Sequence, residues 1–354
     1  MKILDQEISS LSKPFIIAEM SGNHNNDLGR ALELVEIAHK AGASAIKIQT
    51  FTADTMTLDL NENEFFVSDK NNIWEGQSLY QLYQKAHTPW EWHEEIFTLA
   101  SKLGMVSFST PFDETAVDFL EDLNVPAYKI SSLEFNDIPL ILKVASLNKP
   151  VILSTGMASL SEIETVVNIF KEVGNKNFAL LKCTTSYPAD PRDTNISTIR
   201  ALKNIFQCEV GLSDHTMGSG VACASVSHGA NIFEKHFTIS RDDGGVDSSF
   251  SLEPHELSLF VEEINRAAQS QGNVLFGPSG AEKNSLQYRR SIYVSKKIKA
   301  GEMFNKDNIR CIRPGFGLQP KHYGNILGSK SYQDLEIGTA MKWEYINLNA
   351  QDKD

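Results

Sequence analysis

Short apolar runs recur along the chain, and each of them ends in polar side chains. The first run, residues 15–18, is followed by Glu19, and the last, residues 232–233, is followed by Glu234. Short apolar runs that alternate with helical segments are typical of parallel strands joined by crossover helices. Eight such units predict an α/β fold, a closed (β/α)8 barrel whose chemistry lies at the C-terminal ends of its strands. The six other runs are residues 45–48, 105–108, 127–130, 151–153, 178–181 and 210–212.

Segments with a helical spacing of apolar side chains separate the predicted strands. One segment covers residues 116–123 behind Asp113, and another covers residues 163–170 behind Ser161. Asp and Ser commonly cap the N-terminus of a helix, so we expect a helix to start at each of these positions. The last helix of the barrel is expected to begin near Pro254.

One connection, residues 52–88, is much longer than the others and separates the second predicted strand from its helix. Loops of this length in compact domains are usually functional or mobile. Because the connection follows the C-terminal end of a strand, a lid over the site is one interpretation. A tolerated surface insertion is the other.

The character of the sequence changes after the last barrel helix. Residues 271–285 are rich in Gly, Ser, Asn and Pro, and from about Tyr288 onward short β-prone runs alternate with glycine turns. We therefore expect a barrel domain at residues 1–270, a linker at residues 271–288 and a small domain at residues 289–354. A core that small is marginally stable alone, so we expect it to lean on another surface.

Composition and charge narrow the possible partners. The chain has 354 residues and a formal net charge of −12, which argues against nucleic acid and anionic membranes because both require a basic face. A small anionic substrate stays possible, because a few local lysines reverse the field inside a cleft. The four cysteines lack C-x-x-C spacing, which favours free thiols. Neither a signal peptide nor a membrane-spanning run is recognisable, so we expect a cytoplasmic protein.

Lysines and hydroxyl side chains follow the predicted strands. Burying a lysine ammonium is costly unless an anion pairs with it. Four lysines lie within or at the ends of the predicted strands: Lys47, Lys129, Lys182 and Lys235. The partner of each could be a strand carboxylate such as Glu19 or Glu234. Several lysines at one barrel mouth are more simply explained by an anionic ligand. Hydroxyl side chains follow the same strands and suit a bound phosphate or carboxylate: Thr110, Ser132, Ser154, Thr185 and Ser213. A single serine or threonine at a strand end can equally cap the next helix.

His215 and His236 follow the seventh and eighth predicted strands. Neighbouring strands bring such side chains together, and two imidazoles with oxygen donors suit Mn²⁺ or a similar divalent ion. Two histidines that only form hydrogen bonds in loops are the alternative. His24, in the first loop, is as well explained by orienting that loop. Carboxylates at the same face would accept hydrogen bonds from a polyhydroxylated substrate: Glu19, Glu134 and Asp247.

Together these motifs resemble the sialic acid synthase family, the phosphoenolpyruvate-dependent nonulosonic acid synthases. The resemblance covers about residues 14–347, and residues 290–346 resemble the antifreeze-like (SAF) domain that serves in this family as a substrate lid. It implies a TIM barrel followed by a SAF domain. The motifs occur in the family's order: Ile17-Ala18-Glu19, Asn23-His24-Asn25, Lys47-Ile48-Gln49-Thr50-Phe51, Ser109-Thr110-Pro111-Phe112, Tyr128-Lys129-Ile130-Ser131-Ser132, Ser154-Thr155-Gly156-Met157, Gly211-Leu212-Ser213-Asp214-His215 and Glu234-Lys235-His236-Phe237.

Within the family, residues 247–254, 289–294 and 313–318 are most similar to the pseudaminic acid synthases. This similarity implies a transferase that condenses phosphoenolpyruvate with 2,4-diacetamido-2,4,6-trideoxy-β-L-altropyranose. Relatives that use N-acetylmannosamine generally differ in these stretches. A neuraminate or legionaminate synthase with another N-acetyl sugar stays open as an alternative.

The resemblance also implies roles for individual residues. His215 and His236 would hold a divalent metal, Mn²⁺, Mg²⁺ or Co²⁺. Phosphoenolpyruvate would be held by lysines and hydroxyls: Lys47, Thr110, Lys129, Ser132, Ser154, Thr185 and Ser213. Thr185 departs from the family pattern, because sialic acid synthases commonly have Asn at this position. Barrel residues would contact the sugar: Glu19, Asn23, Glu134, Tyr187 and Asp247. In a domain-swapped homodimer, Arg313 and Phe316 of the swapped domain would contact it as well.

The implied reaction is an aldol-like condensation. C3 of phosphoenolpyruvate attacks the metal-polarised aldehyde of the open-chain sugar, water adds at C2, and phosphate leaves. Lys129, His215 and His236 would take part, and either Glu19 or Glu134 would be the general base for the water. Two rival interpretations stay open, a Schiff-base aldolase that uses a strand lysine and a non-catalytic sugar-binding barrel.

Overall fold

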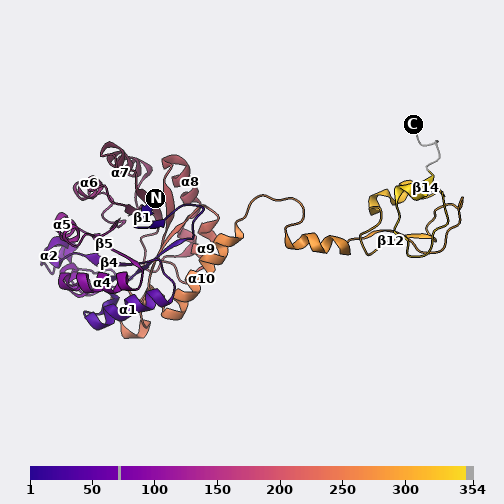
Figure 1. Cartoon of the computed structure of the whole chain (residues 1–354). Coiled ribbons are helices and arrows are strands. Elements are labelled where there is room, and N and C mark those ends of the chain that lie inside the picture. The colour runs from indigo at the N-terminus through magenta and orange to yellow at the C-terminus, as the bar shows by residue number, and fades with distance from the viewer. Residues whose placement is uncertain (71–72, 348–354) are drawn as a thin grey trace. The chain divides into compact units, whose positions relative to one another are not determined.

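The computed structural model describes residues 1–70 and 73–347 and divides into two compact units. The first unit runs from Met1 to Gly272 and the second begins at Asn273 (Figure 1). A 3-10 helix, Ala281–Tyr288, occupies part of the predicted linker. No helix of the described residues is both long and apolar enough to cross a membrane.

The first unit is a closed barrel of eight parallel strands, in which each strand pairs with its neighbours in the chain and the last pairs with the first. All eight strands coincide with the predicted apolar runs, so the predicted (β/α)8 barrel is confirmed. The strands are β3 (Phe15–Glu19), β4 (Ala45–Thr50), β5 (Val106–Pro111), β6 (Tyr128–Ile130), β7 (Val151–Ser154), β8 (Phe178–Cys183), β9 (Glu209–Asp214) and β10 (Ile232–His236).

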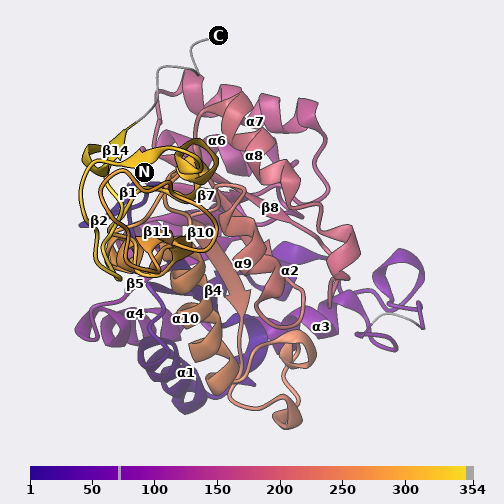
Figure 2. The same cartoon turned by 90° about the vertical axis from the view of Figure 1, so that its right-hand side faces the viewer.

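Helices surround the strands in both views (Figures 1 and 2). The helix behind Asp113 starts as predicted, because the Asp113 side chain accepts from the backbone N–H groups of Thr115 and Ala116. The helices are α1 (Leu28–Lys40), α4 (His93–Lys102), α5 (Glu114–Asp122), α6 (Ile138–Ser146), α7 (Leu160–Glu172), α8 (Ser197–Phe206), α9 (Gly220–Val226) and α10 (Pro254–Ser270).

The predicted cap of α7 was wrong by two residues. Ser159 caps this helix, not Ser161, because the Ser159 hydroxyl accepts from the backbone N–H of Glu162. The Glu162 carboxylate accepts in return from the backbone N–H of Ser159 at 2.7 Å, which completes a capping box. Ser161 is also followed by a glutamate three residues later, Glu164, so the sequence pattern fits either serine and the structure identifies Ser159 as the cap.

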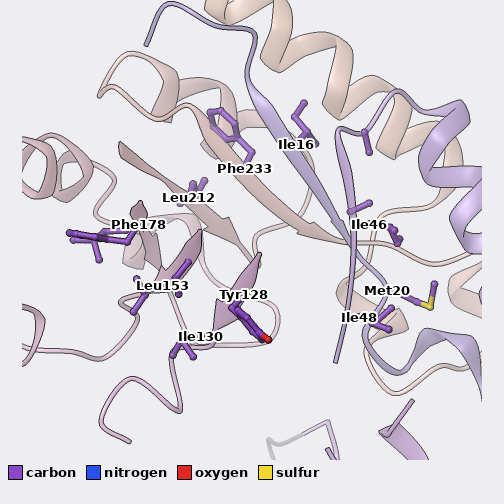
Figure 3. Close-up of a cluster of buried hydrophobic side chains, with 14 of the residues drawn as sticks. Ile16, Met20, Ile46, Ile48, Tyr128, Ile130, Leu153, Phe178, Leu212 and Phe233 are labelled. Atoms are coloured by element: carbon purple, nitrogen blue, oxygen red, sulfur yellow. The ribbon is translucent and has the colours of Figure 1, made fainter. Parts of the chain in front are cut away.

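Side chains alternate between the two faces of each barrel strand. The outward face packs against the helices, as Figure 3 shows for Ile16, Ile46, Leu153, Leu212 and Phe233. The inward face holds a separate apolar cluster toward the N-terminal ends of the strands: Phe15, Ile17, Ala45, Val106, Phe108, Ala127, Ile152, Ala179, Leu181 and Ile232.

An N-terminal hairpin covers the end of the barrel where the strands begin. It is formed by β1 (Lys2–Ile3) and β2 (Gln6–Glu7), which pair antiparallel. Ile3 and Ile8 join the inward apolar cluster and are almost fully buried. The barrel is therefore closed and apolar at this end, which leaves the C-terminal ends of the strands for a site.

The long connection after β4 contains two short helices, α2 (Ala53–Met56) and α3 (Leu79–Ala86), which lie next to each other (Figure 2). The Ser78 side chain caps α3 by accepting from the backbone N–H of Gln81 at 3.2 Å. The connection therefore contains local structure of its own, besides the two residues that lie outside the described part.

The second unit has its own small core. Strands β11 (Ser291–Val294) and β12 (Ile309–Ile312) pair antiparallel, and so do β13 (Lys330–Ser331) and β14 (Ile346–Asn347). The buried side chains are Ile292, Val294, Ile298, Phe304, Ile309, Ile326, Leu335, Met341 and Ile346. The four cysteines of the chain are free, as expected from their spacing.

Candidate active site

A cavity of about 290 Å³ lies at the C-terminal ends of the barrel strands. Strands β4 to β10 each contribute at least one side chain to its lining, and the connection after β4 contributes further apolar side chains. Ten of the predicted site residues line this cavity: Lys47, Thr110, Lys129, Ser132, Ser154, Tyr187, Ser213, His215, His236 and Asp247.

The floor of the cavity is a buried cluster of two lysines and two glutamates. The ammonium of Lys47 lies 2.5 Å from a Glu19 carboxylate oxygen, and it lies 3.8 Å from an oxygen of Glu234. The ammonium of Lys129 lies 3.7 Å from the other oxygen of Glu234. Glu19 and Lys47 are register partners on the neighbouring strands β3 and β4, which explains why they meet.

Hydroxyl groups complete this floor. The Lys47 ammonium donates to the Thr110 hydroxyl at 2.9 Å, and the Lys129 ammonium donates to the Ser154 hydroxyl at 2.7 Å. The Ser213 hydroxyl donates to Glu234 at 3.1 Å. Two cations, flanked by hydroxyls and reachable from one cavity, can bind an anion with more than one charged group.

Burial and neighbouring charges act in opposite directions on these groups. Burial lowers the pKa of Lys129 despite the attraction of Glu234. Burial also opposes the charge of Lys47, but Glu19 and Glu234 outweigh it and raise the pKa of this lysine. The pKa of Glu19 is raised by burial, whereas Lys129 and Lys47 overcome burial and lower the pKa of Glu234. Lys47 is therefore held as a cation.

Two of the four strand lysines are absent from the lining of the cavity, and for Lys235 the structure shows the alternative left open above, a pairing with a strand carboxylate. Lys235 lies on the outward face of β10, with its ammonium 2.8 Å from Asp214 and 5.7 Å from the ring centroid of Phe260. Lys182 lies on the outward face of β8 and donates to the carbonyl of Cys183 at 2.5 Å. The physical reason is the two-residue alternation of a strand, which turns these lysines away from the barrel interior.

His215 and His236 meet as predicted, with ring centroids 5.3 Å apart. The backbone carbonyl of Thr184 accepts from Nδ1 of His215 at 2.9 Å, so Nε2 is available in the neutral ring. Burial opposes the charge of His215, but the neighbouring Cys183 outweighs burial and raises the pKa of this histidine. Nδ1 of His236 is buried without a hydrogen-bond partner and lies 3.7 Å from a carboxylate oxygen of Asp247.

These residues fit a divalent metal ion. Burial, followed by the charges of His215 and Lys47, lowers the pKa of His236 well below its usual range, so the ring is in the neutral form that binds metals. Within the described residues, no three His, Cys, Asp or Glu side chains gather closely enough to hold an ion by themselves. The two imidazoles would therefore leave room for oxygen ligands from outside the protein.

A polar network missed by the sequence analysis connects the first loop to the eighth. The Gln49 side chain donates to Glu19 at 3.0 Å and to the Ser21 hydroxyl at 3.2 Å, and Ser21 donates to the Asp247 carboxylate. Burial raises the pKa of Asp247. Gln49 is two residues beyond Lys47, so strand alternation alone would have identified it as an inward-facing residue.

Cys183 is a second residue that sequence reasoning missed. It ends β8 inside the cavity, and its sulfur lies 3.9 Å from Nδ1 of His215. Burial opposes the thiolate, but the neighbouring His215 outweighs burial and lowers the pKa of Cys183 to about 7. The only signal in the sequence was its position at the end of an apolar run.

Four of the remaining predicted residues lie around the cavity and are absent from its lining. Glu19 lies beneath Lys47, and Glu134 accepts from the hydroxyl of Ser131, which does line the cavity. Burial raises the pKa of Glu134. Asn23 donates to the carbonyl of Phe237 at 2.8 Å and to the Ser251 hydroxyl at 2.9 Å, so it joins two loops.

Thr185 and Ser132 share an unusual environment. Their hydroxyl oxygens are buried and have no hydrogen-bond partner. A Cβ atom on Gly156 would lie 2.5 Å from each of these oxygens, so the loop after β7 approaches them as closely as a glycine allows. Buried hydroxyls without partners are ready to donate to a bound ligand.

His24 orients the first loop, which is one of the roles expected of it from the sequence. Its Nδ1 accepts from the backbone N–H of Asn26 at 3.2 Å, and its Nε2 lies 3.2 Å from the Thr88 hydroxyl. Arg313 and Phe316 belong to the second unit, where both are exposed. Their role toward a sugar stays a prediction.

Comparison with known proteins places this geometry in a family. The model of the NeuB family matches residues 34–275, and the model of the SAF domain matches residues 289–346. A pseudaminic acid synthase of Campylobacter jejuni is 41% identical over 330 residues, which cover 93% of this chain and 96% of the relative. An N,N'-diacetyllegionaminic acid synthase of the same species is 36% identical, over 92% of this chain and 99% of the relative.

A solved structure agrees with these matches. The N-acetylneuraminic acid (sialic acid) synthetase of Leptospira borgpetersenii, crystallised with citrate, has a TM-score of 0.72 and is 32% identical, covering 81% of this chain and 94% of that one. The resemblance to sialic acid synthases and to the antifreeze-like domain is thereby confirmed. The chain belongs to the NeuB family.

Proposed function

We propose that this protein is an enzyme that condenses phosphoenolpyruvate with the open-chain form of 2,4-diacetamido-2,4,6-trideoxy-β-L-altropyranose and releases pseudaminic acid and phosphate. The observation that carries the proposal is the polar floor of the barrel, where Lys47 and Lys129 lie beside hydroxyls in the cavity that also holds His215 and His236. The higher identity to the pseudaminic acid synthase than to the legionaminic acid synthase supports this sugar.

The polar floor suits the phosphate and carboxylate of phosphoenolpyruvate. In the proposed complex, Lys47 and Lys129 neutralise these groups, and the unpartnered hydroxyls of Ser132 and Thr185 donate to them. An ion contact at about 4 Å with an effective dielectric near 20 is worth on the order of 4 kcal/mol before desolvation. Thr110, Ser154 and Ser213 already surround the two ammonium groups or Glu234, so they complete the anion site.

His215 and His236 would hold a divalent ion, Mn²⁺, Mg²⁺ or Co²⁺, which when bound supplies Lewis-acid polarisation of the sugar aldehyde. The neutral state of His236 and its unpartnered Nδ1 support this assignment. Asp247 lies beside His236, where its carboxylate can accept from a sugar hydroxyl.

The chemical step forms one carbon–carbon bond and breaks one phosphate ester. C3 of phosphoenolpyruvate bonds to C1 of the sugar, the aldehyde oxygen takes a proton, and water adds at C2. Loss of phosphate from the resulting tetrahedral carbon leaves the 2-keto acid. Glu19 and Glu134 are the candidate bases for the water, because burial raises the pKa of both carboxylates toward the working pH.

Phosphate release tests this function directly. The purified protein with a divalent metal should release phosphate from phosphoenolpyruvate only when the diacetamido altrose is added. It should respond much more weakly to N-acetylmannosamine and to the sugar precursor of legionaminic acid. A stronger response to either of these would overturn the choice of sugar, and no release with any of them would overturn the synthase.

The same assay distinguishes the rival functions. A Schiff-base aldolase would be trapped by borohydride in the presence of substrate, would need no metal and would release no phosphate. A sugar-binding protein would bind without turnover. Glu19→Gln and Glu134→Gln separate the two candidate bases, since only the true base should lower kcat without a matching change in KM.

A domain-swapped homodimer, with Arg313 and Phe316 of one subunit reaching the sugar in the other, belongs to the same proposal. The exposure of both residues in the second unit supports it. Co-expression of a Lys129→Ala subunit with an Arg313→Ala subunit tests it, because each variant alone should be impaired. A mixed dimer should regain activity by assembling one intact site, and absence of recovery in a confirmed mixed dimer would contradict the swap.

A further inference from the structure

The connection after β4 forms one apolar side of the cavity. Its contributing residues come from α2, from α3 and from the stretch between them. We call this surface the apolar wall, and its members are Met56, Val67, Trp74, Leu79, Leu82 and Tyr83. The polar residues at the strand ends line the same cavity, and further apolar side chains outside the wall also contribute to it: Phe51, Ala86, Phe112, Leu133 and Val246. The cavity therefore presents two different chemical environments to one ligand.

Ring contacts place the apolar wall beyond the polar end. The ring centroid of Tyr187 lies 4.5 Å from that of His215, and it lies 5.8 Å from that of Trp74. Trp74 is in turn fixed in place, because its indole N–H donates to the backbone carbonyl of Val246 at 3.0 Å. A ligand that extends from His215 past Tyr187 thus reaches the wall.

The aliphatic members of the wall offer no hydrogen bonds. Met56, Val67 and Leu79 are half-buried and face the cavity. A hydroxyl placed against them would lose its hydrogen bonds to water and gain none, whereas a methyl group would be favoured by leaving water. The backbone of Val67 is held by two hydrogen bonds, to Gln77 and Gly76, so the wall is a built feature of the connection.

This inference rests on the proposed function, which fixes the direction of the sugar. The aldehyde carbon must lie near the phosphoenolpyruvate, at the polar floor, so the sixth carbon of the open chain lies farthest from it. We propose that the apolar wall binds the C6 methyl group of the sugar and selects a 6-deoxy substrate over its 6-hydroxy counterpart. Residues of the connection after β4 would then determine specificity without touching the reacting atoms.

The test compares two sugars that differ in one atom. The 6-deoxy and the 6-hydroxy forms of the 2,4-diacetamido hexose are assayed by phosphate release. The ratio of their kcat/KM values should favour the 6-deoxy form by about tenfold to a hundredfold, the range that an apolar pocket achieves against an added hydroxyl. Leu79→Asn and Val67→Thr place a polar group in the wall at similar volume, and each should reduce this ratio severalfold.

A matched control lies in the same connection. Leu58 is 61% exposed and is absent from the lining, so Leu58→Asn should leave the ratio unchanged. Two variants are used because Leu79 begins α3 and its replacement could disturb that helix. A circular dichroism spectrum like that of the parent protein shows that each variant is folded.

The outcomes separate this inference from the proposed function. Turnover of both sugars at equal kcat/KM would overturn the methyl-binding wall and leave the synthase standing. A 6-deoxy preference that survives both wall substitutions would show that other residues read C6, and would overturn the assignment. No phosphate release with either sugar would overturn the proposed function, and the wall with it.

Discussion

Two ion pairs of the barrel each join a lysine to a carboxylate on a neighbouring strand, but their surroundings differ. Glu19 and Lys47 pair across β3 and β4 on the inward face, and Asp214 and Lys235 pair across β9 and β10 on the outward face. The side-chain exposure of Lys47 is 4% and that of Lys235 is 1%, so burial does not distinguish the two pairs.

The difference lies in what surrounds each pair. Lys47 of the inward pair lines a cavity together with Lys129, a second cation, and with the unpartnered hydroxyl of Ser132. The outward pair is closed off by Phe260, and Asp214 also accepts from the backbone N–H and the hydroxyl of Thr216. A buried lysine is therefore a functional candidate only where a cavity reaches it. The outward pair is part of the packing between strand and helix.

Replacement of Lys129 should produce the largest effect. Lys129→Ala removes one of two cations from the anion site, and we expect kcat/KM to fall by at least about a thousandfold, which corresponds to about 4 kcal/mol. Glu234 keeps Lys47 and Ser213 as partners, so the thermal midpoint should change little. Near-normal turnover of a folded variant would exclude Lys129 from the site.

Replacement of Lys235 should give the opposite pattern. Lys235→Met leaves Asp214 buried without its cation, and we expect the free energy of unfolding to fall by about 3 kcal/mol while turnover per folded molecule is kept. Denaturant unfolding measures the first quantity and phosphate release the second. The double variant Lys235→Met/Asp214→Asn should recover part of the stability, and a selective loss of turnover would contradict the structural role.

The outward face also contains a group that makes stability depend on pH. Burial lowers the pKa of His93 to about 4, and its Nε2 lies 2.8 Å from the Thr50 hydroxyl. In the unfolded chain His93 has a pKa near 6.5, so it binds a proton at a pH where the folded protein keeps the ring neutral. The free energy of unfolding therefore falls as pH drops. Between about pH 7 and 5 the contribution of His93 to this loss should be about 2 kcal/mol, obtained by denaturant unfolding as the difference between the parent and a His93 variant, because His24, whose pKa burial also lowers to about 4, adds its own loss over the same range.

A matched variant isolates this contribution. His93→Gln keeps a polar partner for Thr50 without the titration, so the slope of stability against pH should flatten over this range. An unchanged slope would assign the pH dependence to other groups. Catalytic parameters of the folded variant at neutral pH should resemble those of the parent, because His93 is absent from the lining of the cavity.

A smaller effect is expected at the loop after β7. In Gly156→Ala the new methyl group would displace the hydroxyls of Ser132 and Thr185, and we expect KM for phosphoenolpyruvate to rise about tenfold, the effect of weakening one hydrogen bond to an anion. Ser132→Ala provides the comparison, since it deletes one hydroxyl and leaves the glycine. An unchanged KM in both variants would place the anion elsewhere.

The barrel could be predicted because each strand carries its own signal. An apolar run followed by polar side chains is a local pattern, and eight repetitions fix the architecture with little further information. The convergence of Lys47, Lys129, His215 and His236 follows from this architecture, because all strands end at the same mouth. The apolar wall was not predictable in this way, since the fold of the connection after β4 depends on contacts within it.

A signal in the sequence separates the strand lysines that reach the cavity from those that do not. The alternation of strand residues distinguishes the inward-facing Lys47 from the outward-facing Lys182 and Lys235. The face of each lysine follows from the number of residues between it and an apolar strand residue whose face is known. Ser159 and Ser161 are each followed by a glutamate three residues later, so the capping-box pattern alone could not identify Ser159 as the cap of α7. The partners of Asn23 required the structure, since they depend on how separate loops meet.

The hairpin that covers the start of the strands has a kinetic consequence. With that end filled by Ile3 and Ile8, the described residues of the barrel leave the C-terminal ends of the strands for the entry of the proposed substrates. In the proposed complex phosphoenolpyruvate binds at Lys47 and Lys129, on the floor of the cavity, so it should bind before the sugar, which would otherwise block its way. The enzyme should therefore show compulsory-order kinetics, with the nine-carbon product departing before the inorganic ion trapped beneath it.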